Sequence, residues 1–198
     1  MHLQNTMFYF YLEIMDKRVQ KTINAVYAAF AEVLKEKDFA DLSVEDILKR
    51  ANISRSTFYA HFKTKGDVLD SVSRNIFNHV FSHALEQEES HDFSQASILD
   101  YEHLFTHVLY HLRDEKELIQ SILATSCRKD FLNELREHIA PLILRCLREG
   151  FFVQKEVPEE LQLRHIEESF LATVAYWFES GCEKSPEEMV EAFLCLNG

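Results

Sequence analysis

Three helix-start signals between residues 43 and 64 limit the possible fold more strongly than any other feature of this sequence. Ser43 lies three positions before Asp46, which is a capping-box pattern. Thr64 and Asp67 repeat that pattern, and Ser54 is a third N-cap residue between them. The hydroxyl of an N-cap residue accepts a hydrogen bond from a backbone N–H that the first helical turn leaves unpaired. The sequence therefore predicts three successive helix starts separated by tight turns.

The rest of the chain is also predicted to be helical. Only 4 glycines and 3 prolines interrupt 198 residues, and apolar residues recur at helical spacing before and after the capped segment. We expect an all-α fold of about nine helices. Besides the three capped helices, helices are expected over residues 16–37, 98–112, 114–124, 131–147, 158–181 and 185–196. Pro141 should kink or split its helix, because proline has no N–H to donate.

Charge divides the chain into two parts. The formal net charge is −12, yet residues 16–65 contain ten Lys or Arg against seven acids, whereas residues 66–198 contain eleven against twenty-five. A modestly basic module joined to a strongly acidic one indicates two functions in one chain. We expect a flexible tail, or an artefact of the start site, over residues 1–15, and two domains over residues 16–64 and 65–198.

Within the basic module, residues 43–65 form two short expected helices that meet across a turn at residues 52–53. Residues available to pack inside the angle between these helices are Ile47, Ala51, Ile53, Phe58 and Phe62. Residues expected to point outward from the second helix are Arg55, Ser56, Thr57, Tyr59, Ala60 and Lys63. This arrangement is a helix-turn-helix, whose second helix presents its first side chains to the DNA major groove. Arg55 has donors suited to guanine, while His61 and Lys65 suit phosphates.

Five short motifs in and around this segment are Ala28-Ala29-Phe30, Phe39-x-x-Leu42-Ser43-Val44-x-x-Ile47, Ala51-Asn52-Ile53-Ser54, Thr57-Phe58-Tyr59-x-His61-Phe62 and Lys65-x-x-Val68-Leu69. Together they resemble the DNA-binding domain of the TetR family of bacterial transcriptional regulators, over residues 16–80. The Thr-Phe-Tyr-x-His-Phe core is specific to that family. Two small departures, Gly66 and Val68, lie outside the DNA-contacting residues.

The resemblance implies a role for each polar residue of the segment. Contacts to bases or to the backbone beside them are implied for Arg55, Ser56 and Tyr59. Contacts to phosphates are implied for Ser43, Thr57, His61 and Lys65. These seven residues form the expected DNA-binding site.

The C-terminal part resembles one branch of the same family more weakly. Trp177-Phe178-x-x-Gly181 and Ser185-Pro186-Glu187-Glu188-Met189 are similar to the closing helices of that branch. The resemblance implies a homodimer in which the last two helices of each subunit pair as a four-helix bundle. The residues expected at this interface are Phe170, Val174, Trp177, Met189 and Phe193. The other aromatic residues of this part are expected mainly in the core, and no ligand-pocket residue is assigned.

Histidines recur every four residues at His103, His107 and His111, and His79 and His83 repeat that spacing. Neighbouring pairs could chelate a metal ion. Because the apolar stripe of the helix lies elsewhere, His103 and His107 are predicted to face solvent, and a surface stripe without metal is the favoured interpretation. The four cysteines show no zinc-site spacing and are interpreted as buried thiols in a reducing cytoplasm.

Several classes of protein are not expected. The sequence has no glycine-rich phosphate loop, nucleophile elbow or zinc-protease motif, so neither an enzyme nor a cofactor is predicted. No membrane span is predicted. The sequence instead predicts a homodimeric repressor that binds a palindromic double-stranded DNA operator and responds to a small-molecule effector. The alternative is a DNA-bound activator or adaptor whose C-terminal domain binds a partner protein.

Overall fold

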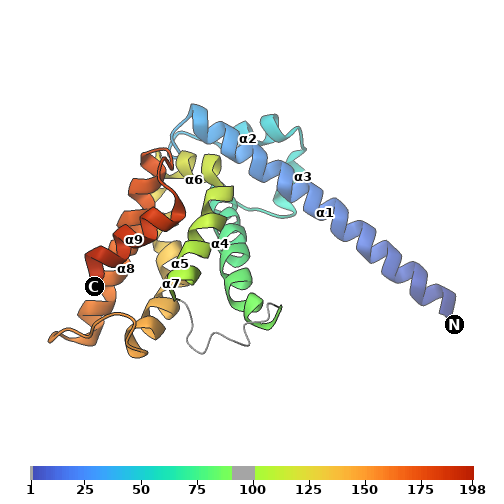
Figure 1. The fold of residues 1–198 in the computed structure, drawn as a ribbon. Helices are drawn as coiled ribbons and strands as arrows, with labels where there is room; N and C mark the ends of the chain where they lie inside the picture. Colours follow the sequence, from blue (N-terminus) through green and yellow to red (C-terminus); the bar gives the residue numbers. More distant parts are fainter. Residues whose placement is uncertain (1, 91–100) are drawn as a thin grey trace. The chain divides into compact units, whose positions relative to one another are not determined.

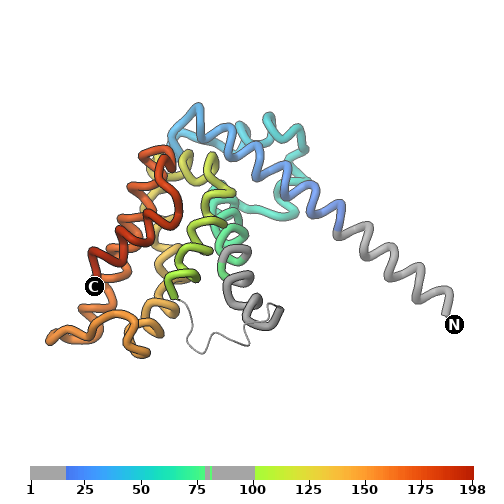
Figure 2. Tube along the Cα trace, in the orientation of Figure 1, coloured from blue at the N-terminus to red at the C-terminus, as the bar shows by residue number. Residues whose placement is uncertain are grey.

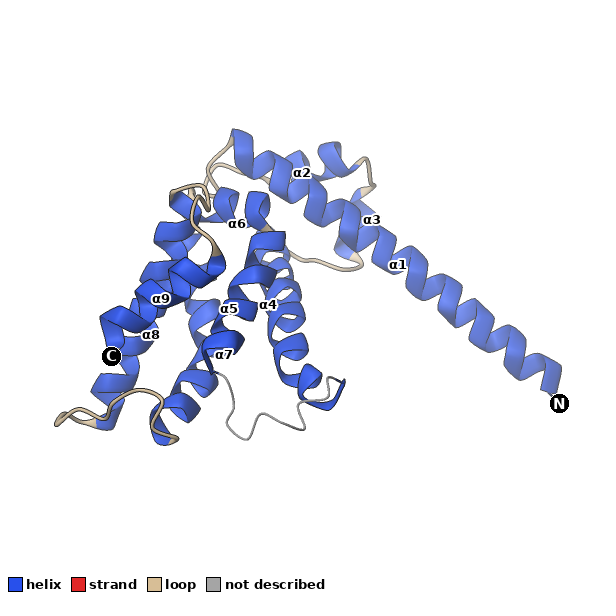
Figure 3. Ribbon diagram, viewed as in Figure 1, coloured by secondary structure: helices blue, strands red, loops and turns tan. Residues whose placement is uncertain are grey.

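The computed structural model describes the backbone of residues 2–90 and 101–198, and the side chains of residues 17–78, 81 and 101–198. Over these residues the regular structure is entirely α-helical (Figures 1 and 3). The all-α fold is therefore confirmed for the described part of the chain. None of its helices combines the length and apolarity needed to cross a membrane. The described helices are α1 (His2–Glu36), α2 (Val44–Ala51), α3 (Arg55–Tyr59), α4 (Lys65–Ser90), α5 (Tyr101–Asp114), α6 (Lys116–Leu123), α7 (Arg128–Arg148), α8 (Glu159–Glu179) and α9 (Pro186–Asn197).

The chain divides into two units, Met1–Leu69 and Asp70–Gly198, with the boundary inside α4. The first unit consists of α1, α2, α3 and the first turns of α4, and α1 packs against α2. Its core is built from apolar residues that are almost fully buried: Val26, Phe30, Val33, Leu34, Ile47, Phe58, Phe62 and Val68. This core holds the short helices of the expected helix-turn-helix in place.

Helix α1 is longer than the sequence pattern suggested. Its backbone is helical from His2, well before residue 16, where the apolar pattern begins. The side chains of α1 are described from Lys17 onward, and the tube in Figure 2 is coloured along the sequence from blue in this helix to red in α9. Between there and Glu36, the buried residues follow helical spacing, as expected for one face packed on α2.

The second unit has an aromatic core that joins α5 to the last two helices, α8 and α9. The ring centroid of Phe105 on α5 lies 5.7 Å from that of Phe170 on α8 and 5.2 Å from that of Phe193 on α9. Phe152, in the loop before α8, lies 6.3 Å from Phe105. Tilted and edge-on ring contacts at these distances are favourable beyond the apolar area that they bury. Helix α8 also packs against α6 and α7, so it has neighbours on several sides.

Helix α7 continues through Pro141 without interruption. The predicted split at this residue is therefore wrong. Proline removes the N–H that would bond to the carbonyl of Glu137, one turn earlier. Because Pro141 and Glu137 are both exposed, water can satisfy that carbonyl.

The five residues expected at a dimer interface lie in the core of the second unit, so their assignment to that interface is wrong. Their exposed fractions lie between 0% and 3%: Phe170, Val174, Trp177, Met189 and Phe193. The indole N–H of Trp177 donates to the carbonyl of Lys184 at 2.9 Å, which satisfies its one polar atom inside the unit. Side chains buried so completely within one chain cannot contact a second subunit.

The four cysteines are all free, as expected, but not all are buried. Cys127 and Cys146 are buried, whereas Cys182 is half-buried and Cys195 is exposed. Burial raises the pKa of the Cys146 thiol to about 12. That thiol therefore stays protonated, and so a poor nucleophile, at neutral pH.

Candidate nucleic-acid interface

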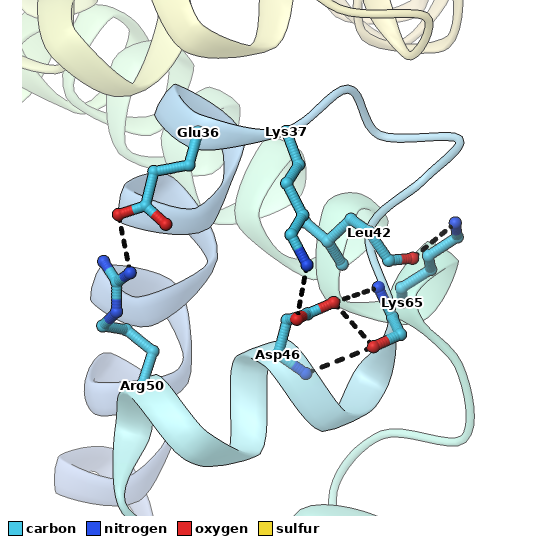
Figure 4. A network of polar contacts seen from close by, with 7 residues as sticks. Glu36, Lys37, Leu42, Asp46, Arg50 and Lys65 are labelled. Atoms are coloured by element: carbon cyan, nitrogen blue, oxygen red, sulfur yellow. Dashed lines mark hydrogen bonds and ion pairs between the residues drawn. The ribbon is translucent and has the colours of Figure 1, made fainter.

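The interface begins at Ser43, where the predicted capping box is present. The Ser43 hydroxyl accepts a hydrogen bond from the Asp46 N–H at 3.3 Å, and the Ser43 N–H donates to the Asp46 carboxylate at 2.9 Å. The Lys37 ammonium donates to the same carboxylate at 2.7 Å (Figure 4). The bonds from Lys37 and then Ser43 lower the pKa of Asp46 below its ordinary value of 3.8. Asp46 is thus ionised at neutral pH, which favours the N-terminal end of the α2 dipole.

A left-handed residue at the end of α2 makes the turn tight. Asn52 has φ 52° and ψ 48°, a conformation that asparagine tolerates better than most residues. The N–H groups of Asn52 and Ile53 both donate to the carbonyl of Leu48. The chain therefore reverses at once and brings α3 next to α2, with Ile47 and Phe58 fully buried.

Helix α3 is short and is fixed by a hydroxyl cluster at its start. The Ser54 hydroxyl accepts a hydrogen bond from the Thr57 N–H at 3.1 Å. Its oxygen also lies 2.9 Å from the hydroxyl of Ser56 and 2.8 Å from that of Thr57. On the inner side Phe58 is fully buried, and the next residue, Tyr59, is 53% exposed. The buried phenylalanine thus sets which edge of α3 faces outward.

Arg55, the first residue of α3, forms an ion pair across the turn. Its guanidinium donates to the Glu45 carboxylate at 2.7 Å, and the two side chains are 73% and 44% exposed. An ion pair this exposed adds little to stability, but it orients the guanidinium and leaves most of its five donors for a ligand. Sequence reasoning missed Glu45, because its relation to Arg55 exists only once the intervening turn has formed.

Lys65 was expected at a phosphate, but its ammonium group is bound inside the first unit. Its Nζ atom donates to the carbonyls of Phe39, Ala40 and Leu42 at 2.7, 3.0 and 2.7 Å (the bond to Leu42 is drawn in Figure 4). It also lies 4.9 Å from the centroid of the Phe39 ring. An ammonium group has three N–H donors, so all three close the loop between α1 and α2. Lys65 is half-buried here and acts as a structural residue.

The third predicted cap is also present, at the start of α4. The Thr64 hydroxyl oxygen accepts a hydrogen bond from the Asp67 N–H at 3.1 Å. The Asp67 carboxylate accepts from the N–H groups of Lys63 at 2.7 Å and Thr64 at 3.3 Å. The bond from Lys63, and after it a bond of 3.0 Å from the Thr64 hydroxyl, lower the pKa of Asp67. The first turn of α4 is therefore capped in the way the sequence predicted.

Two acids of α1 hold α2 in position. The guanidinium of Arg50 donates to Glu32 at 2.8 Å and to Glu36 at 2.7 Å (the second bond is drawn in Figure 4). These residues were not singled out from the sequence, since they lie fourteen or more positions apart. They do not lie on α3, but they join α2 to α1.

Five of the seven expected DNA-binding residues have exposed side chains in the first unit: Ser43, Arg55, Ser56, Tyr59 and His61. Thr57 is half-buried in the hydroxyl cluster, and Lys65 is bound to backbone carbonyls. Two short helices joined by a tight turn, with an exposed polar edge on the second, define a helix-turn-helix DNA-binding protein.

Comparison with known families agrees for both parts of the chain. Residues 26–72 match the family described as "Bacterial regulatory proteins, tetR family". Residues 100–196 match a "Transcriptional regulator C-terminal region". The two matches together cover most of the chain, which belongs to the TetR family of bacterial transcriptional regulators. The members of that family are transcriptional regulators and not enzymes, which agrees with the expectation that this chain is not an enzyme.

Individual relatives show how far the likeness extends. YxbF, an HTH-type transcriptional regulator of Bacillus subtilis (strain 168), is 25% identical over 91% of this chain but only 45% of its own length. EthR of Mycolicibacterium smegmatis is 46% identical over 24% of this chain and 22% of its own length. A solved TetR transcriptional regulator from Streptococcus agalactiae 2603V is 25% identical, with a TM-score of 0.71, over 93% of this chain and 98% of that one. The chain thus spans less than half the length of these curated relatives.

Proposed function

We propose that this chain is a homodimeric repressor in the bacterial cytoplasm, which binds a palindromic operator and releases it when a small molecule binds the second unit. The observation that best supports DNA recognition is the exposed edge of α3, where Arg55, Ser56 and Tyr59 flank the buried Phe58. Arginine can bond to both O6 and N7 of guanine, and hydroxyl groups bond to bases or phosphates. The first-turn N–H groups of α2, beside Ser43, suit a phosphate.

The modest charge of residues 16–65 is a reason to expect two copies of the first unit on one operator. Residues 16–65 contain only ten Lys or Arg against seven acids, and the Lys65 ammonium is bound internally. Each copy of the first unit should therefore make few phosphate contacts, and binding by one copy alone should be weak. In a two-fold dimer the two recognition helices must lie about 34–36 Å apart to enter successive major grooves on one face of DNA, which requires a palindromic site.

The outer faces of α8 and α9 offer a surface for that dimer, in place of the five buried residues. Leu161 and Tyr176 on α8 are each 58% exposed, and Leu196 on α9 is 70% exposed. The amide of Asn197 donates to the hydroxyl of Ser169 at 2.8 Å, so the two helices lie side by side. Small exposed residues on the same helices are Ala172 and Ala192. An exposed apolar stripe on two adjacent helices suits pairing as a four-helix bundle.

The dimer surface can be tested with a double substitution, Tyr176→Glu with Leu196→Glu. Four carboxylates would then face one another across the two-fold interface, so the variant should sediment as a monomer and lose operator affinity. The exposed Ala124, at the end of α6, provides the control Ala124→Glu, which should remain dimeric. A double variant that still sediments as a dimer would remove these faces of α8 and α9 from the proposal.

The regulatory part of the proposal is tested by footprinting the purified protein on genomic DNA. We expect protection of two-fold symmetric sites near promoters, followed by release when the correct class of small molecule is added. A two-state protein releases DNA only if the effector binds the non-DNA-binding state more tightly. Protection of asymmetric DNA would contradict the palindromic operator. Occupancy that no metabolite mixture changes would favour a partner protein as the effector.

A further inference from the structure

Two histidines of α5 lie close together, and neither belongs to the proposed DNA interface. The Nε2 atoms of His107 and His111 lie 3.0 Å apart, and the ring centroids lie 4.4 Å apart with the rings at 88°. Both side chains are half-buried, whereas His103, one turn earlier, is exposed. His107 is therefore less exposed than the sequence predicted. The i, i+4 spacing of these histidines thus brings two imidazole nitrogens close together on α5.

The separation of these nitrogens fits a shared metal ion. Zinc–imidazole bonds are about 2.0–2.1 Å long, and with bonds of that length a separation of 3.0 Å gives an N–metal–N angle of roughly 90–100°. Adjacent ligands of a tetragonal or octahedral ion meet at about this angle, while a tetrahedral ion needs a wider one. Imidazole nitrogen is a preferred ligand for Ni²⁺ and Cu²⁺. The geometry therefore fits these ions better than tetrahedral Zn²⁺.

The surroundings of the pair also favour a cation. The Nδ1 atom of His111 lies 3.9 Å from the carboxylate of Asp114. This carboxylate is too distant for a hydrogen bond, but it lies near enough to stabilise positive charge on the imidazole or on an ion bound to it. The second unit, residues 70–198, contains twenty-four acids against eleven bases, so it attracts cations in general.

We propose that His107 and His111 bind Ni²⁺ or Cu²⁺ through their Nε2 atoms, with water completing the coordination. The described residues hold no cluster of three or more histidine, cysteine or acidic side chains suited to a metal. The pair thus supplies two protein ligands, and affinity should be moderate. A hydrogen bond between two neutral imidazoles, with no metal affinity, is the competing explanation of the 3.0 Å separation.

The test is calorimetric titration of the full chain, without an affinity tag, with Ni²⁺ at pH 7.5. Nickel is preferred to copper as the probe because Cu²⁺ oxidises exposed thiols such as Cys195. We expect the wild type to bind Ni²⁺, and His107→Gln and His111→Gln each to raise the Kd at least ~10-fold, since each removes one of two chelating ligands. Nickel should also raise the Tm of the wild type and not that of the variants. This second measurement uses His107→Gln alone if His111→Gln does not fold.

Two control variants make the outcome specific. His165 on α8 is exposed, so His165→Gln should leave nickel affinity unchanged. The side chains of His79 and His83 lie outside the described residues, and the double variant His79→Gln/His83→Gln measures any contribution from them. Wild-type affinity in both His107→Gln and His111→Gln would overturn the assignment. So would a wild type that binds no nickel, or loss of binding only in the His79/His83 double variant.

Discussion

Two pairs of neighbouring aromatic residues show how the two units differ. In α3, Phe58 is fully buried and Tyr59 is 53% exposed. In α8, Trp177 is fully buried and Tyr176 is 58% exposed. Each pair has one ring inside and one outside. The sequence predicted both orientations in α3, whereas in α8 it placed the buried tryptophan at a dimer interface.

The difference comes from how many neighbours each helix has. Helix α3 has a cap at Ser54, one buried phenylalanine and a single inner side, so its orientation follows from local sequence. Helix α8 packs against α6, α7 and α9, and most of its circumference is buried. A long helix with neighbours on several sides has no single apolar stripe to interpret. In such a helix the largest side chains fill the core of the chain itself, and only the side chains that remain exposed can form an interface.

The largest effect is expected from Phe170→Ala, which tests that explanation. Phe170 is 1% exposed and lies 5.3 Å from Phe193 between ring centroids. Removing a buried phenylalanine lowers the free energy of unfolding by about 3–5 kcal/mol, as urea denaturation would measure. If Phe170 were an interface residue, the variant would instead dissociate while each subunit kept its stability, and sedimentation would show that result.

The next largest effect is expected from Tyr59→Ala. Loss of a base-contacting side chain should weaken operator binding by ~1–3 kcal/mol, while unfolding should change little because the ring is 53% exposed. Tyr110, a 39% exposed tyrosine of the second unit, is the matched control. Fluorescence anisotropy should show weaker binding for Tyr59→Ala alone. Equal loss in Tyr110→Ala would mean that the effect does not arise at α3.

A smaller effect, similar in the two units, is expected from the helix caps. Ser43 and Ser185 each form a complete capping box. Replacing either with alanine should lower the free energy of unfolding by about 1 kcal/mol. Only Ser43→Ala should also weaken operator binding, since Ser43 lies in the proposed DNA interface. Ser185 does not, and it lies at the opposite end of α9 from Leu196, the residue of that helix proposed for the dimer surface. Equal effects on DNA affinity would remove Ser43 from that interface.

The smallest effect is expected from Asp46→Asn, whose effect on stability should depend on pH. The pKa of Asp46 is lowered in the folded chain, so its bonds stabilise the fold fully above the ordinary value of 3.8, and this stabilisation is lost as the pH falls toward the folded pKa. Asp46→Asn should therefore be less stable than the wild type at pH 7, and the difference should shrink below pH 3.8. Urea denaturation at several pH values measures this. A difference that does not change with pH would contradict the role given to the carboxylate.

Features set by neighbouring residues could be predicted from the sequence, whereas contacts between residues far apart in the sequence could not. All three caps, the buried Phe58 and the exposed Arg55 follow from local patterns that a short capped helix obeys. The capture of Lys65 by backbone carbonyls could not be predicted, because it joins residues more than twenty positions apart. Helix α7 also passes through Pro141, since solvent exposure lowers the cost of its missing hydrogen bond.

The central claim is that the outward edge of α3 contacts base pairs, and Arg55→Ala tests it most directly. The measurement is a paired titration of the variant on its operator and on scrambled DNA of equal length, at one fixed salt concentration. We predict that operator affinity falls by ~1–3 kcal/mol while affinity for scrambled DNA changes much less. A folded Arg55→Ala variant that binds the operator as tightly as the wild type would contradict the claim.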